Sequence, residues 1–407
     1  MTFPPNRGLR RGATRLALLA GALLLTAGQA PPVSPAVDRE LRPRTLRLKV
    51  VAPEPVLSSG KIRSRDVVQT HALILSAQER RRLREGRVTG DLALRLEGLY
   101  ARIEARRPRD ARFVREGEGW VAQARTGWAV RRGPTAERVR AALLAGREEA
   151  TVALRLIPPA GTVAGLHSRG VTTHLTTGQS SFAGSPDFRV HNIRVGAARF
   201  QGLWLEPGSV LDFNRTVGRI AADRGFVPGY VITGASLTME PGGGICQVST
   251  TVFRAGYQAG LEVVERHGHS HHVAYYDPPG FEATVYAPAK NLRLRNDTAA
   301  PLLMQVEWNL EAGTLAVHLF GAPPDRRVMV SAPQVRSTAL APAPTFVADP
   351  ALRPGEARRL DMPAAGMNTQ IVRRITRGSQ TTTDRTTSQY RPWGGVFAVA
   401  PGDDRLR

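Results

Sequence analysis

The sequence has a single cysteine, Cys246, among its 407 residues, which excludes an intramolecular disulfide framework. Lysine is also scarce, because 53 of the 56 basic residues are arginine. Apart from residues 16–27, no stretch is apolar enough to suggest a membrane span, and even that run is short for one. The cysteine content therefore leaves one unpaired thiol whose role has to be explained.

Acidic residues are outnumbered, 34 against 56, and the formal net charge is +22. Such a charge favours polyanionic surroundings. Nucleic acid is the usual partner of a basic chain, but the sequence has no nucleic-acid motif and no interleaving of aromatic and basic residues. We therefore expect no nucleic acid, and we expect anionic cell-envelope polymers as possible partners.

The first thirty residues have the pattern of a secretory signal, residues 1–30. Arginines precede the apolar run 16–27, and the small residues Gly28 and Ala30 form a cleavage site. We expect export to the periplasm, cell wall or outside, with no transmembrane span in the mature chain; an uncleaved N-terminal anchor is the alternative. Exported cysteines usually occur in pairs, so an unpaired one indicates chemistry, with a buried inert thiol as the alternative.

Periodicity and turn residues predict an α+β fold in which a cysteine-bearing helix packs on an antiparallel sheet. A capping box at Ser76–Glu79 predicts a helix start. Strands are expected at 272–276 and 282–286, among others. The predicted organisation is a Pro-rich irregular segment 31–66, a small α+β domain 67–158, a linker and loop 159–186, a central domain 187–320, and a β-rich appendage 321–407.

Three glycines lead directly into Cys246, and a helical pattern of about fifteen residues follows it and stops at Gly260. Glycines permit positive φ angles and close approach to a ligand. Backbone N–H groups at a helix N-terminus are unpaired and favour negative charge. About twenty residues downstream, the cluster Arg266–His272 contains four histidines. This pattern favours a presented thiol with a nearby base.

The histidines also allow a second interpretation. His267, His269 and His271 alternate, so on a strand they would share one face and, with Cys246, resemble zinc ligands. Gly268 interrupts the strand pattern, and the catalytic interpretation is preferred. We therefore predict no metal and no cofactor.

The order and spacing of several motifs resemble those of the VanW-like family over roughly 190–310. The motifs are Asn192-Ile193, Glu206-Pro-Gly208, Phe213-Asn214, Val217-Gly-Arg219, Gly225-Phe226, Gly242-Gly-Gly-Ile-Cys-Gln-Val-Ser-Thr-Thr251, Ala259-Gly-Leu261, Glu265-Arg266, His269-Ser270, Tyr275-Tyr276 and Asn296. Residues 90–157 resemble, less specifically, a peptidoglycan-binding domain that often precedes a VanW domain.

The resemblance implies a cell-wall role, and some members of the family are L,D-transpeptidases with a cysteine nucleophile. By position, Cys246 is the expected nucleophile and His269 the expected base. Glu282 is the expected orienting group, with Asp212 as the alternative. Where the family often has Gly-x-Asp-Ala, this chain has Gly280-Phe-Glu-Ala283, which lengthens the carboxylate's reach.

The expected substrate is a peptidoglycan stem peptide, and the expected substrate-binding residues are Gly243, Gly244, Gln247, Arg266 and Asn214. N–H groups at the helix start would stabilise an oxyanion. The function predicted is a cysteine-dependent acyl transferase that cross-links stem peptides. The alternatives are a cysteine peptidase and a non-catalytic wall-binding accessory protein. An enzyme should have an accessible thiol beside His269, whereas an accessory module should bury it.

Overall fold

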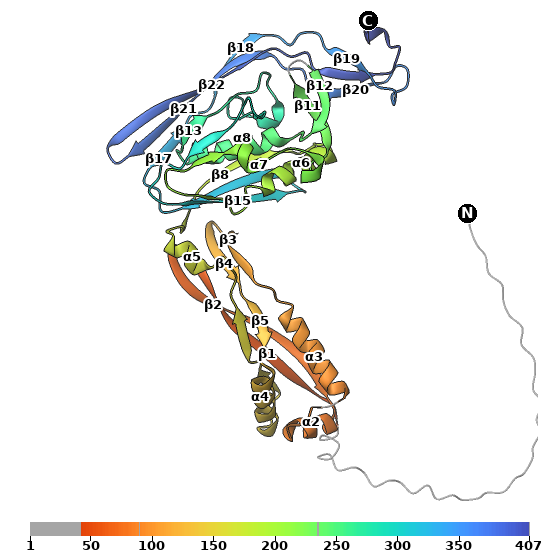
Figure 1. Cartoon of the computed structure of the whole chain (residues 1–407), viewed down its shortest axis with the longest axis vertical. Coiled ribbons are helices and arrows are strands. Elements are labelled where there is room, and N and C mark those ends of the chain that lie inside the picture. Colours follow the sequence, from red (N-terminus) through yellow and green to blue (C-terminus); the bar gives the residue numbers. More distant parts are fainter. Residues whose placement is uncertain (1–41, 89, 234–235, 407) are drawn as a thin grey trace, which may run out of the picture.

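The computed structural model describes residues 42–88, 90–233 and 236–406. Its helices and largely antiparallel sheets confirm the predicted α+β class. An elongated N-terminal unit meets the central domain at one end, and the C-terminal sheets lie along the far side of the central domain (Figure 1). The predicted signal, residues 1–30, lies outside the described residues. Among the described helices, none combines the length and apolar character that a membrane crossing needs.

The N-terminal unit begins earlier than predicted. Strands β1 and β2 pair along their whole length, so the predicted boundary between residues 66 and 67 falls inside β2. Leu46, Leu48 and Val50 alternate with exposed residues as a half-buried strand requires, and this pattern predicts a strand over 45–51; Pro53 and Pro55 hid its continuation to Ser58. The five-stranded sheet consists of β1 (Arg44–Ser58), β2 (Lys61–Leu75), β3 (Arg109–Glu116), β4 (Gly119–Arg125) and β6 (Glu149–Thr151).

Helices cover this sheet. The predicted capping box is confirmed, because the Ser76 hydroxyl accepts from the Glu79 amide and the Glu79 carboxylate accepts from the Ser76 amide. The remaining elements are α2 (Ala77–Arg84), α3 (Asp91–Glu104), α4 (Arg132–Leu144), α5 (Val163–Ser168) and the two-stranded pair β5 (Gly127–Val130) and β7 (Leu154–Ile157).

The N-terminal unit and the central domain share a small apolar core. The rings of Phe113 and Phe320 stack with centroids 4.1 Å apart. The buried side-chain amide of Gln305 makes two hydrogen bonds to the backbone of Phe113. It accepts from the Phe113 N–H at 2.7 Å and donates to the Phe113 carbonyl at 3.0 Å. These contacts join the two parts at β3 and β15.

The predicted linker 159–186 contains a core strand of the central domain. Its strand β8 pairs with β16 along the sheet and packs under helix α8 (Ile245–Gln258). The Thr- and Gly-rich composition of β8 concealed it, because strands of ordinary composition are richer in branched and aromatic residues. The sheet consists of β8 (Thr173–Ser181), β16 (Thr314–Gly321), β15 (Leu302–Asn309) and β9 (Trp204–Leu205).

Two predicted strands of the central domain are wrong. Residues 274–276 form a short 3₁₀ helix, and Thr284 and Tyr286 make only isolated bridges. Hydrogen bonds from side chains of α8, in place of strand pairing, hold this segment. The other elements are α6 (Asp187–Ala198), α7 (Phe213–Val217), β10 (Val210–Asp212), β11 (Pro228–Thr233), β12 (Ser236–Pro241), β13 (Glu262–Glu265), β14 (Arg293–Arg295) and a 3₁₀ turn, Ala222–Arg224.

The C-terminal region is β-rich, with two sheets and a terminal 3₁₀ turn. One sheet contains β17 (Arg327–Val330), β18 (Gln334–Ala339), β21 (Gly366–Arg377) and β22 (Gln380–Tyr390). The other contains β19 (Thr345–Ala348), β20 (Ala357–Asp361) and β23 (Val396–Val399), and Asp404–Leu406 forms the turn.

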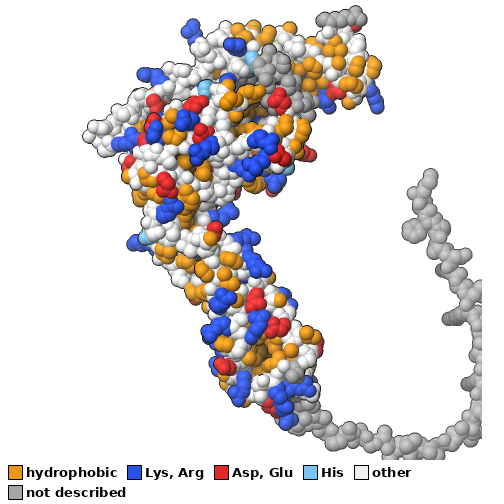
Figure 2. All heavy atoms as spheres, in the orientation of Figure 1, with side chains coloured by type: hydrophobic (Ala, Val, Ile, Leu, Met, Phe, Trp, Pro, Cys, Tyr) orange, Lys and Arg blue, Asp and Glu red, His pale blue; other side chains and the backbone are white. Residues whose placement is uncertain are grey.

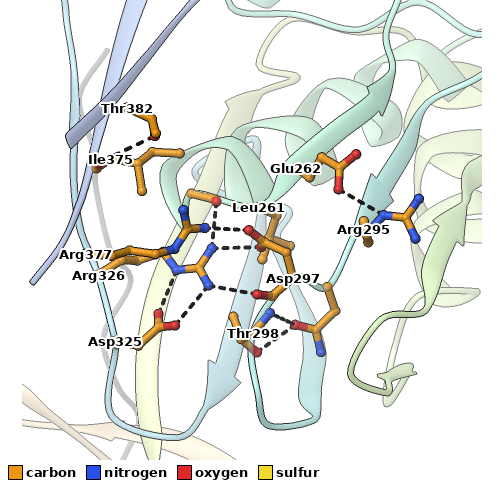
Figure 3. A network of polar contacts seen from close by, with 12 residues as sticks. Leu261, Glu262, Arg295, Asp297, Thr298, Asp325, Arg326, Ile375, Arg377 and Thr382 are labelled. Carbon is orange, nitrogen blue, oxygen red and sulfur yellow. Dashed lines mark hydrogen bonds and ion pairs between the residues drawn. The ribbon is translucent and has the colours of Figure 1, made fainter. Parts of the chain in front are cut away.

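Two buried arginines fasten this region to the C-terminal end of α8. Arg326 donates to the Gly260 carbonyl at 3.0 Å and pairs with Asp297 and Asp325 (Figure 3). Arg373 donates to the Tyr257 and Leu261 carbonyls. Cations are favourable at a helix C-terminus because the last carbonyls lack partners. Elsewhere, Lys and Arg side chains are spread over both units among fewer acidic ones (Figure 2).

The contact between α8 and β8 requires glycine at position 178. A Cβ there would lie 2.2 Å from the Thr251 carbonyl oxygen and 2.4 Å from the Ala255 nitrogen, both backbone atoms. We expect Gly178→Ala to lower the free energy of unfolding by about 1–3 kcal/mol or more, because helix and strand must separate. Gly98→Ala is the control: Gly98 is exposed in α3 with open space around it, and alanine should stabilise it by roughly 0.5–1 kcal/mol. Urea unfolding of both variants measures the two changes in free energy of unfolding. Equal stabilities would contradict the close packing of α8 on β8 at Gly178.

Candidate functional site

Cys246 is the second residue of α8, as the glycine pattern predicts. Gly244 has φ of 109°, and a Cβ at this position would lie 2.9 Å from Ile193 Cγ1 and 3.1 Å from the Arg189 carbonyl oxygen. The buried Gly243 offers its carbonyl to the Asn192 amide at 3.3 Å. The glycine turn is therefore needed for close packing of α8 against α6, which accounts for Gly243 and Gly244 without a ligand.

The Cys246 thiol is half-buried and unpaired. Its sulfur lies 3.5 Å from the Thr284 hydroxyl and 3.6 Å from the Val285 carbonyl oxygen, to which the thiol donates. Among the contacts of the described residues, none joins the sulfur to His269.

The next residues of the motif hold the fold together. Gln247 is fully buried, and its amide donates to the Ser180 hydroxyl at 3.2 Å. Ser249 donates to the Ala283 carbonyl at 2.6 Å, and Thr250 exchanges hydrogen bonds with the Ala283 backbone. The side chains thus tie the 281–285 segment and β8 to the helix. Gln247 is therefore shut off from solvent, and its Oε1 is buried without a hydrogen-bond partner among the described residues.

His269 stacks on Tyr276, with ring centroids 4.7 Å apart. Its Nδ1 is enclosed and has no hydrogen-bond partner. Burial lowers the pKa of His269 to about 3, and the positive charges of Arg266 and Lys290 add to the shift. Burial also raises the pKa of Tyr276, an effect to which the neighbouring Cys246 adds. Tyr276 thus has both Cys246 and His269 in its surroundings.

Glu282 and Arg266 form a buried ion pair that anchors the C-terminal hairpin. Their side chains are 2% and 6% exposed, and Arg266 Nη2 lies 3.1 Å from Glu282 Oε1. The Tyr390 hydroxyl donates to the other Glu282 oxygen at 2.6 Å and accepts from the Gly280 N–H. Arg266 also donates to the Ser388 hydroxyl of β22. These contacts account for Glu282 and Arg266 as a structural lock, and none of them reaches the His269 ring.

Asn214 and Asp212 hold the loop that carries Lys290. The Asn214 amide donates to the Lys290 carbonyl at 2.9 Å. Asp212 accepts from the Asn291 amide at 2.8 Å, so it supports the same loop and does not orient His269.

The neighbouring histidines point to separate partners. His267 pairs with Glu265 at 3.0 Å, and His271 bonds the Arg391 carbonyl and packs on Trp393. Within residues 42–88, 90–233 and 236–406, no group of three or more His, Cys, Asp or Glu side chains is arranged to hold a metal ion.

A cleft of about 520 Å³ opens beside His269, between the central domain and the C-terminal hairpin. Its walls are Gly268, His269, Ser270 and Lys290 on one side, and Asn368, Gln389, Tyr390, Arg391 and Pro392 on the other. Sequence reasoning found only His269 among these residues. The cleft was missed because its walls are about a hundred residues apart in the chain, and no local pattern signals their meeting.

Fold and site together define an α+β domain in which a half-buried cysteine begins a buried helix next to a polar cleft. A family model described as VanW like protein matches residues 188–320, so this segment is similar to that family. The predicted family resemblance is confirmed there. The peptidoglycan-binding domain expected over 90–157 stays a prediction.

Two curated proteins are similar to part of the chain. One is "Uncharacterized protein YoaR" of Bacillus subtilis (strain 168), 34% identical over 139 residues, which are 33% of this chain and 46% of YoaR. The other is "Vancomycin B-type resistance protein VanW" of Enterococcus faecalis (strain ATCC 700802 / V583), 30% identical over 116 residues, 27% of this chain and 42% of that protein. The matches thus span less than half of each relative.

Removing one partner of the buried lock tests its structural role. Arg266→Met leaves the Glu282 carboxylate buried without its cation, and we expect a loss of about 3–5 kcal/mol in the free energy of unfolding. Arg295→Met is the matched control, because the Arg295–Glu262 pair of the same domain is 41% and 52% exposed and should contribute less than about 1 kcal/mol. Denaturant titration gives both values, and hydrogen exchange should rise in β22 for Arg266→Met. Equal losses in the free energy of unfolding for the two variants would contradict a structural role for the Arg266–Glu282 pair.

Proposed function

We propose that this protein acts at the cell wall as a non-catalytic accessory of the VanW type that binds peptidoglycan stem peptides. Two facts support the setting: the match of residues 188–320 to the VanW-like family, and a relative whose name is that of a vancomycin resistance protein. The predicted export signal and the net charge of +22 agree with an anionic envelope.

The observation that carries the proposal is the cleft beside His269. Its volume of about 520 Å³ lies within the range of small-ligand sites, roughly 300–1,000 Å³. Amide, hydroxyl and cationic side chains line it, which suits the amides and carboxylates of a short peptide. The cleft lies where the histidine of the family motif meets the hairpin.

Catalysis is the weaker interpretation because the base is poorly matched. Burial, with the charges of Arg266 and Lys290, lowers the pKa of His269 to about 3, so its imidazole is a weak proton acceptor. A general base works best with a pKa near the working pH. The thiol instead donates to the Val285 carbonyl, as a structural cysteine does.

Binding of a disaccharide tetrapeptide tests the proposal by calorimetry, together with retention on isolated sacculi. Asn368 lies exposed on β21 in the wall of the cleft, so Asn368→Trp should fill the space and weaken binding by roughly ten-fold or more. Thr383→Trp is the control, because Thr383 is exposed on the same hairpin outside the cleft. Absence of binding by the unaltered protein, or equal affinity of the two variants, would refute the proposal.

A second candidate function is acyl transfer by Cys246, which its incomplete burial at the start of α8 favours. The reaction would join the sulfur to a stem-peptide carbonyl and release the leaving amine, and the thiol proton would go to that amine. Acceptor amine or water would then release the acyl group, giving a transpeptidase or a peptidase.

Intact mass after incubation with disaccharide tetrapeptide distinguishes these functions. The accessory function predicts an unchanged mass and unchanged substrate for both the natural protein and Cys246→Ala. An adduct or cross-linked dimer that disappears in Cys246→Ala would establish acyl transfer. Trimmed monomer without dimer, again lost in the variant, would establish a peptidase.

A further inference from the structure

The cleft beside His269 contains two cations from different parts of the chain, Lys290 and Arg391. Within the described part of the chain, no carboxylate lies in ion-pair range of either side chain. By contrast, Arg266, Arg326 and Arg373 are each paired with a carboxylate. Two like charges brought to one cleft without counter-charge repel each other unless an anion joins them.

The backbones of both residues are held in place. Lys290 exchanges backbone hydrogen bonds of 2.8 and 2.9 Å with Tyr286. The Arg391 N–H donates to the Ser270 carbonyl at 2.7 Å, which fastens the end of the hairpin to the histidine segment. The long side chains therefore start from fixed points in two different segments of the chain, and a preorganised start lowers the cost of binding.

His269 adds a third indication of positive potential. Its pKa is lowered first by burial, and then by the charges of Arg266 and Lys290. Its enclosed Nδ1 has no partner, and its ring forms part of the cleft wall. A bound anion would offset the nearby positive charge and raise the pKa of the imidazole.

We propose that Lys290 and Arg391 form an anion subsite in this cleft that takes the free α-carboxylate at the end of a peptide. The proposal rests on the proposed function for the identity of the peptide. A guanidinium binds a carboxylate through two parallel N–H bonds, and an ammonium adds a point charge. The subsite makes the protein selective for peptides with a free carboxyl terminus over amidated ones.

N-acetylalanine and N-acetylalaninamide are the probes, because they have the same shape around the alpha carbon but differ in charge. Binding to the full chain is followed by NMR of the His269 imidazole and by calorimetry at two salt concentrations. We expect the acid to bind roughly ten-fold or more tightly than the amide, with affinity that falls as salt rises. The pKa of His269 should rise when the acid binds.

Matched variants locate the subsite. Lys290→Gln and Arg391→Gln should each weaken binding of the acid by roughly ten-fold or more and leave the weaker amide binding unchanged. Lys61→Gln, on β2 of the N-terminal unit, and Arg385→Gln, on the same hairpin outside the cleft, are the controls and should bind as the natural protein does.

Each outcome decides between the two proposals. Equal affinity for acid and amide, or no detectable binding of the acid, overturns the subsite even if stem peptides bind. If inorganic phosphate binds as tightly as the acid, the carboxylate assignment is overturned in favour of a phosphate site. If the acid binds through Lys290 and Arg391 while the disaccharide tetrapeptide does not bind, the subsite stands and the proposed function fails.

Discussion

The whole central domain depends on one constraint: the polar side chains of the buried helix α8 must all find partners away from water. Gln247, Ser249, Thr250, Thr251 and Arg254 are each 5% exposed or less. An unmatched buried polar group costs about 1–3 kcal/mol, so the cost of five of them would be comparable to the whole stability of a domain. Apart from the Gln247 Oε1, which has no partner among the described residues, their polar groups are matched by β8 and by irregular backbone at 276–283, and Arg254 alone donates to four carbonyls there. The helix thus organises segments that no strand ladder holds.

The same requirement makes the C-terminal hairpin part of the domain. Arg266 and Glu282 lie side by side in the central domain, but their remaining hydrogen-bonding groups are satisfied by Ser388 and Tyr390 of β22. At the other end of α8, Arg373 donates to the Tyr257 carbonyl in the last turn, and Arg326 donates to the Gly260 carbonyl just beyond the helix. The hairpin thus supplies both polar partners and one wall of the cleft. The family match ends at residue 320 and leaves that wall out.

Sequence reasoning succeeded where the signal is local. The glycines and the apolar period placed the start of α8 within one residue, and the Ser76 capping box was found by its spacing. It failed where the decisive contact is distant or the composition is atypical. The strand β8 is rich in Thr and Ser, and Gly178 must admit the helix backbone, so the strand has few of the apolar residues that mark a strand in sequence. Glu282 was assigned to the histidine by chain order, whereas its partner Tyr390 is 108 residues away.

The buried lock also bears on what His269 can do. Arg266 keeps its charge beside Glu282, and that charge lowers the pKa of the adjacent imidazole beyond the effect of burial. A histidine held neutral in this way is a poor proton acceptor for a thiol, but it is a suitable wall for a cationic cleft because it adds no third charge. Moving Arg266 away would raise the pKa of His269, and it would also leave the buried Glu282 carboxylate without its cation. Stability and general-base catalysis therefore make opposite demands on one guanidinium, and the contacts of Arg266 satisfy stability.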